Sequence, residues 1–294
     1  MAKSSIYFLS IVFLMIQLSC TKREWYQKDL SESVRKQYAV QLGNGASYRN
    51  YQGTVAEQMH HFEALAMDSS NGDLWRELGT ARVKRGILDE MYHYYEGGVQ
   101  RKPAKWAGFR GYLYLYFYRD FERAIADFNY NDEVVGEVTH SQGQDHDYMR
   151  GIAYYGLKEF EEALRYLNIY IDRVEKDQGS DWVDVYAYLY KGLTLMKLDR
   201  NPEAIEAFDD VLKNYPKLAD AYYHKAKIYA EQGEQSKAWQ ELEKAEEYFQ
   251  MGYFHQRPYV EVLDQIYSQD IADLKQGIFS DKNTAEMIRK KRTI

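Results

Sequence analysis

The side chains that could bind a metal ion fall in two places along the chain. His60 and His61 are adjacent, and adjacent residues on a helix point about 100° apart, so their imidazoles cannot share one ion. The segment from His140 to His146 also contains Asp145 and Asp147, and a loop could bring these ligand types together. A polar insertion between two helices explains the same residues. We therefore predict no metal site and no cofactor.

Sequence patterns typical of catalysis do not occur in this chain. There is no HExxH, no GxSxG and no phosphate-binding GxxxxGK[ST], and Gly97-Gly98 lacks a preceding strand. Paired carboxylates such as Glu161-Glu162 and Asp209-Asp210 fall on outward faces of predicted helices, where water solvates them. The sequence predicts a protein that is not an enzyme.

The composition is that of a folded protein with an unusual content of tyrosine. Of 294 residues, 45% are hydrophobic and 28% charged, which excludes the disordered class. The net charge of −7 argues against a general electrostatic fit to nucleic acid. The 29 tyrosines offer large rings with polar tips, which suit half-buried helix faces and binding surfaces.

The only cysteine, Cys20, follows a short apolar segment at the start of the chain. Lys3 precedes an apolar run from Ile6 to Ile16, which is too short to span a bilayer but fits the central region of a signal peptide. The segment resembles the signal of bacterial lipoproteins, in which a small residue, here Ser19, precedes a lipidated cysteine. Gln17 departs from that pattern, which usually has an aliphatic residue at this position.

This resemblance implies a signal peptide over residues 1–19 and a palmitate-bearing Cys20 at the start of a flexible tether over residues 20–50. Ordinary cleavage of a secretory signal and an uncleaved anchor remain alternatives. Residues 21–23 contain no acidic side chain. Since acidic residues there mark surface export in some bacteria, the expected location is the cell envelope, at the outer membrane facing the periplasm.

From Tyr51 onward, apolar residues recur at helical spacing, with breaks every dozen or so residues. The pattern repeats: Gly192 to Ala226 and Ala204 to Ala238 are both 34 residues apart. This period predicts paired short helices in a repeat architecture. At these positions a small side chain allows the two helices of a pair to approach closely.

The 34-residue period and the segment Trp75-x2-Leu78-Gly79 resemble the tetratricopeptide repeat family. The resemblance implies an all-α fold, a right-handed α-solenoid of about five helix-turn-helix repeats. A terminal helix must cover the last apolar face of such a solenoid, and the amphipathic stretch Pro258 to Gln276 is assigned to it. The predicted segments are an N-terminal helix (51–70), repeats at about 71–104, 105–139, 146–178, 185–218 and 219–251, and a capping helix with a basic tail (254–294).

In this family the first helix of each repeat lines a concave groove. Carrying over the groove positions gives these partner-binding candidates: Arg76, Trp106, Phe109, Tyr116, Tyr148, Tyr155, Tyr186 and Tyr223. An aromatic series along a groove suits an extended or helical peptide, although aromatic residues at helical spacing also serve as core packing.

The predicted function is therefore a scaffold for protein–protein interaction. It would be anchored to the envelope by lipid and would bind a peptide or protein partner in its groove. The alternative is a lipoprotein that captures a glycan or another ligand on the same aromatic groove. The two differ in their partner, which the sequence does not identify.

Overall fold

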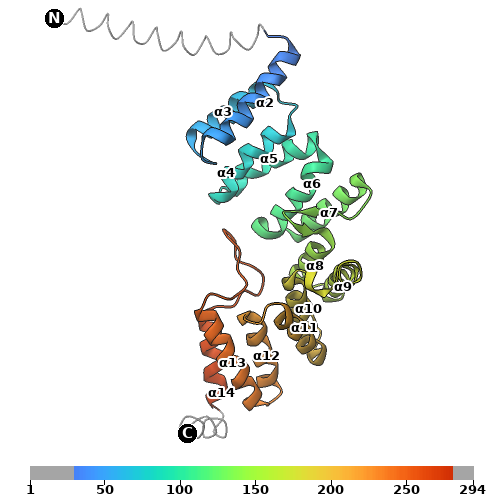
Figure 1. Cartoon of the computed structure of the whole chain (residues 1–294), viewed down its shortest axis with the longest axis vertical. Coiled ribbons are helices and arrows are strands. Elements are labelled where there is room, and N and C mark those ends of the chain that lie inside the picture. Colours follow the sequence, from blue (N-terminus) through green and yellow to red (C-terminus); the bar gives the residue numbers. More distant parts are fainter. Residues whose placement is uncertain (1–29, 281–294) are drawn as a thin grey trace, which may run out of the picture. The chain divides into compact units, whose positions relative to one another are not determined.

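The computed structural model describes residues 30–280, which are almost entirely helical (Figure 1). The predicted signal peptide, Cys20 and the basic tail lie outside the described residues. Between residues 30 and 280, no helix is both long and apolar enough to cross a membrane. The chain divides into two compact units, residues 1–103 and 104–294. The predicted all-α helical-repeat fold is confirmed.

The first unit contains two antiparallel helix pairs. Their bounds are α2 (Glu32–Arg49) with α3 (Val55–Met67), and α4 (Gly72–Lys84) with α5 (Leu88–Arg101). The flexible tether predicted up to residue 50 is wrong over α2. Ala39, Gly43 and Ala46 of α2 are buried, and a β-carbon at Gly43 would lie 2.6 Å from Leu74 of α4. The signal for a helix is weak here because α2 is polar and buries only small residues.

The second unit contains four further helix pairs. They are α6 (Pro103–Leu113) and α7 (Phe121–Val135), α8 (His146–Leu157) and α9 (Phe160–Asp177), α10 (Val185–Lys197) and α11 (Asn201–Asn214), and α12 (Ala219–Glu231) and α13 (Gln235–Gln250). A π-helical turn, η1 (Tyr114–Tyr118), extends α6, and a short 3-10 helix, η2 (Ser180–Trp182), precedes α10. The strands β1 (His140–Ser141) and β2 (Gln144–Asp145) form a small antiparallel hairpin between α7 and α8.

Glycines allow the two helices of a pair to approach closely, as the repeat pattern predicts. A β-carbon at Gly192 of α10 would lie 2.5 Å from the ring of Phe208 on α11. The equivalent distances are 2.6 Å from Gly151 to Leu167 and 2.7 Å from Gly79 to Tyr95. These distances are too short for any β-carbon contact, so glycine is required at each crossing.

The end of the chain differs from the predicted capping helix. Only α14 (Ser268–Ser280) is helical, and it packs beside α13 (Figure 1). Residues 258–267, which we expected to be helical, instead form part of an irregular segment. We call residues 253–267 the inner-face loop, because this segment contacts the first helices of several pairs. Its apolar residues Val262 and Ile266 are buried and stand four residues apart, a helical spacing that occurs here in a non-helical segment and misled the sequence assignment.

We expect Gly192→Ala to lower the free energy of unfolding by about 1–3 kcal/mol, because the methyl group must displace the buried ring of Phe208. Gly277→Ala is the matched control. A β-carbon at Gly277 of α14 meets no atom within 4 Å, so higher helix propensity should stabilise that variant by up to about 1 kcal/mol. Urea denaturation followed by circular dichroism measures both. Equal effects of the two substitutions would contradict the packing argument.

Candidate functional site

The first helices of the pairs in the second unit share one surface, which we call the inner face. It consists of Tyr112 of α6, Tyr116 of η1, Tyr155 of α8, Tyr186 and Tyr190 of α10, and Asp220 of α12. The inner-face loop covers these residues. The candidate site is therefore a surface that is already covered by an irregular segment of the same chain.

The start of the loop is attached through its backbone to the first turn of α12. The carbonyl oxygen of Tyr253 accepts from the backbone N–H of Ala219 at 2.8 Å, and the N–H of His255 donates to Asp220 at 2.8 Å. The imidazole of His255 stacks on Tyr186 with ring centroids 3.9 Å apart and contacts the edge of Tyr190. His255 is only 5% exposed, so this contact belongs to the interior of the unit.

Arg257 is the cationic contact of the loop. Its guanidinium carbon lies 3.9 Å from the ring centroid of Tyr116 and 5.5 Å from that of Tyr112. Within the described part of the chain, Nη1 of Arg257 is buried without a hydrogen-bond partner. The two tyrosine rings therefore provide much of its stabilisation, through cation–π attraction in a partly desolvated place.

The second half of the loop is held by hydroxyl groups and surface charges. The hydroxyl of Tyr155 donates to Asp264, whose other oxygen lies 3.7 Å from Nζ of Lys197. The hydroxyl of Tyr190 donates to the carbonyl oxygen of Leu263 at 3.4 Å. Arg119, at the end of η1, donates to both the carbonyl and the carboxylate of Glu261 at 3.0 and 3.1 Å.

Burial shifts the pKa values of the ionisable groups where the loop meets the inner face. It raises the pKa of Asp220 to about 6, although the N–H of His255 opposes the shift. It lowers the pKa of His255 to about 3, so this imidazole stacks on Tyr186 in its neutral form at pH 7. Burial also raises the pKa of Tyr186 to about 12, which keeps its hydroxyl protonated.

The candidate residues predicted from the sequence are in several environments. Tyr116, Tyr155 and Tyr186 contact the loop directly, as described above. Phe109 links Trp106 to Tyr112 through ring contacts of 6.0 and 5.9 Å, so these aromatic residues continue the row on α6. Tyr148 is 1% exposed and stacks on Tyr170 of α9, which is core packing.

The remaining two candidates lie away from the loop contacts. Tyr223 of α12 lines a cleft of about 420 Å³ whose other wall, Asp270 to Ile278, is α14. Arg76 is in the first unit, where its guanidinium pairs with the neighbouring Glu77.

Sequence reasoning missed the groups that the loop contributes. His255, Arg257 and Asp264 lie in the segment from residue 254 onward that we assigned to the capping helix and tail. Pro258 is no signal against a helix that starts there, because proline is favoured at the first helical position. Asp220 was also missed. Acidic residues are common in the first turn of a helix, where they interact favourably with the helix dipole, so Asp220 did not stand out as a binding residue.

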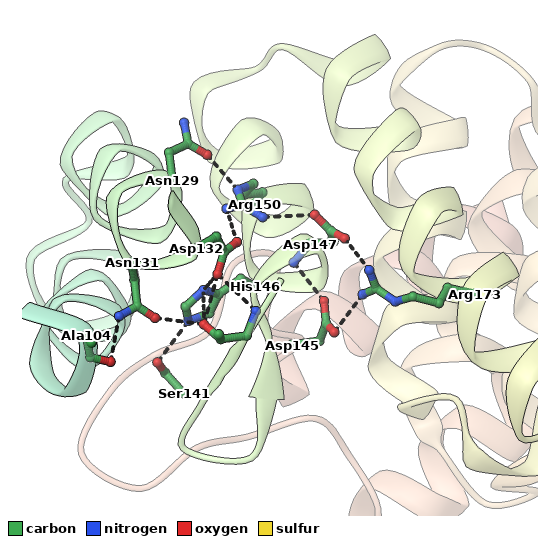
Figure 2. A network of polar contacts seen from close by, with 11 residues as sticks. Ala104, Asn129, Asn131, Asp132, Ser141, Asp145, His146, Asp147, Arg150 and Arg173 are labelled. Carbon is green, nitrogen blue, oxygen red and sulfur yellow. Dashed lines mark hydrogen bonds and ion pairs between the residues drawn. The ribbon is translucent and has the colours of Figure 1, made fainter. Parts of the chain in front are cut away.

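A buried polar network surrounds the hairpin between α7 and α8 (Figure 2). His146, which is fully buried, lies 2.7 Å from Asp132, and Arg150 bonds both Asp132 and Asp147. Arg173 of α9 extends the network, at 2.8 Å from Asp147 and 2.6 Å from Asp145. Asp145, His146 and Asp147 are of types that bind metal ions, but two guanidinium groups, those of Arg150 and Arg173, supply the positive charge there.

In the described part of the chain, one group of carboxylate and imidazole side chains is close enough to share an ion. It comprises Glu57, His61 and Glu77, with candidate ligand atoms within 4.8 Å of one another. Glu57 and His61 are buried and lie 3.1 Å apart, and Glu57 also accepts from the N–H of Gly53 at 2.8 Å. These hydrogen bonds satisfy the buried carboxylate of Glu57, so Glu57 and His61 form a structural pair within the first unit.

Comparison with known proteins identifies the repeat. Residues 189–253 match the tetratricopeptide repeat family. No curated protein matches the chain in sequence. Among solved structures, a tetratricopeptide repeat protein from Parabacteroides merdae is 18% identical, with a TM-score of 0.52, covering 82% of this chain and 84% of its own.

Two further structures show the same fold. PilW, a type IV pilus biogenesis factor, is 16% identical with a TM-score of 0.57, covering 83% of this chain and 98% of its own. PilF of Pseudomonas aeruginosa is 13% identical with a TM-score of 0.56, covering the same shares. At these identities the likeness concerns the fold alone.

The polar network gives a prediction on stability and pH. Burial raises the pKa of Asp132, but hydrogen bonds from His146 and Arg150 outweigh it and lower the pKa to about 2. A lowered pKa means that the carboxylate stabilises the fold above its unfolded pKa, near 4, and that this stabilisation is lost as the pH falls towards 2. We expect Asp132→Asn to lower the free energy of unfolding by about 2–3 kcal/mol at pH 7.

The difference from wild type should shrink as the pH falls from 4 to 2, which urea denaturation at several pH values would measure. Glu203→Gln is the control, because Glu203 makes only an exposed pair with Arg200, and its replacement should leave the free energy of unfolding nearly unchanged at every pH. A difference for Asp132→Asn that stays constant with pH would refute the electrostatic explanation.

Proposed function

Since this chain contains tetratricopeptide repeats, matched over residues 189–253, we propose that it is a non-catalytic scaffold that binds a protein partner. The observation that carries the proposal is the inner face itself. It binds an irregular segment of the chain, residues 253–267, through stacked rings, a cation over tyrosines, and backbone hydrogen bonds. Peptide recognition uses the same kinds of contact.

The chemistry of the inner face favours a peptide over a glycan. The ring faces of Tyr116 and Tyr186 are occupied by side chains of a peptide segment, Arg257 and His255 respectively. Asp220 and the Tyr190 hydroxyl are engaged with backbone groups, an N–H and a carbonyl respectively. Backbone recognition of this kind fits an extended polypeptide.

We further propose that the scaffold is held in the cell envelope by a lipid on Cys20, at the outer membrane with its repeats in the periplasm. The support is the apolar run from Ile6 to Ile16 followed by Ser19 and Cys20. A lipid anchor would place the repeats at the membrane surface, where a scaffold could hold an envelope protein. The likeness to PilW concerns the fold, and does not extend a role in pilus biogenesis to this chain.

The lipid anchor predicts that wild-type cells grown with radioactive palmitate will contain a labelled form of this protein. Cys20→Ala removes the only thiol in the sequence and should abolish the label. Gel autoradiography of the immunoprecipitated protein measures it. Equal labelling of the two forms would exclude acylation of Cys20.

The partner-binding prediction can be tested with a photo-crosslinking amino acid placed at Trp106, in the aromatic row of α6. In intact cells this position should give a discrete adduct with an envelope protein. The matched control position is Tyr130 of α7, a second helix, whose side chain is 44% exposed. The same adduct at both positions, or none at Trp106, would argue against partner binding on the inner face.

A further inference from the structure

The connection between α13 and α14 is longer than a repeat protein needs. Residues 251–267 join these helices, whereas helix–helix connections usually take about 2–8 residues. The segment also contains two non-glycine residues with positive φ, Tyr259 at 71° and Asp264 at 51°. A long connection held in an uncommon backbone conformation is typical of a functional segment.

The capping helix does not depend on this loop for its packing. Ile271 and Ile278 of α14 are buried in a cluster with Ala238, Trp239 and Leu242 of α13. That cluster contains no residue of the loop. The loop can therefore leave the inner face while α14 remains in place on α13.

Loop release would uncover a set of groups that need partners. Tyr155, Tyr190 and Asp220 are each less than 6% exposed and are bonded to the loop. A second ligand that buries them again must supply matching groups, because a buried polar group without a partner is costly. It must also fill the space left by Val262 and Ile266, which are 3% and 2% exposed.

We propose that the inner-face loop is a resident ligand, which occupies in cis the place where a segment of a protein partner binds. This inference rests on the proposed scaffold function and specifies the partner. The partner segment presents a guanidinium to Tyr112 and Tyr116, aliphatic side chains, and a carboxylate to Tyr155. The positions of Tyr116 and Tyr155 on the inner face set the distance between its two charges.

A labelled peptide with the sequence of residues 253–267 serves as the probe, and fluorescence anisotropy measures its binding to the detergent-solubilised full chain. In the wild type, the loop of the same chain competes with the labelled peptide for the inner face, at an effective concentration near the millimolar range. The variant His255→Ala/Arg257→Ala removes two loop side chains and leaves every residue of the inner face unchanged. We expect it to bind the peptide about tenfold more tightly than the wild type, or better.

The control variant, Arg200→Ala/Lys237→Ala, removes two exposed cations whose pairs are with Glu203 and Glu234. It should bind the peptide as the wild type does. A peptide carrying Arg257→Ala should lose most of the gain in affinity. Equal binding to all three chains, or equal binding of both peptides to the loop-weakened chain, would overturn the proposal.

Hydrogen exchange of the wild type provides a test that does not depend on the variants. The amide of His255 should exchange at least about tenfold faster than those of α13 and α14, because the loop opens alone. Exchange of the loop at the rate of α13 would mean that it opens only when the unit unfolds, which also overturns the proposal.

The outcomes separate this inference from the scaffold function. If the loop-weakened variant binds the peptide more tightly but Trp106 gives no adduct, the loop is still a resident ligand and the envelope partner is rejected. If Trp106 gives an adduct but weakening the loop does not change peptide binding, the partner is supported and its competition with the loop is rejected.

Discussion

The repeats of the second unit depend on the close approach of the two helices in each pair. At the crossing of α10 and α11, a β-carbon on Gly192 would lie 2.5 Å from the ring of Phe208. The side of α10 that carries Gly192 is filled by α11. Bulky residues on another side of α10, such as Tyr186 and Tyr190, lie on the inner face and contact His255 of the loop. The same constraint at successive pairs places tyrosines from α6, α8 and α10 on one surface.

Tyrosine suits this surface because each residue contributes two kinds of contact. Its ring packs against an imidazole or a guanidinium, as Tyr186 and Tyr116 do with the loop. Its hydroxyl hydrogen-bonds to the loop, as those of Tyr155 and Tyr190 do. A surface of phenylalanines could pack an apolar segment equally well, but it would leave buried carbonyl and carboxylate groups without donors.

The hairpin between α7 and α8 shows how an insertion is accommodated within the repeat. Apolar packing alone cannot fix a polar connection, so charged groups from three helices hold it. Asp132 of α7, Arg150 of α8 and Arg173 of α9 form a continuous network through Asp147 (Figure 2). Every charge in this chain of contacts has an opposite charge beside it, which is the condition for burying charges without a large loss of stability.

The sequence alone determined the repeated helix pairs from α4 to α13, because small residues at recurring positions report local contacts within a repeat. It also indicated which tyrosines lie on the first helices. It did not reveal the pairing of the polar helix α2 with α3. The amphipathic stretch after Pro258 was misread as helical, since burial of Val262 and Ile266 does not specify what buries them. Only the tertiary structure decided that Arg257 and His255 lie on Tyr116 and Tyr186. Those contacts join residues far apart in the sequence, and no local pattern encodes such pairs.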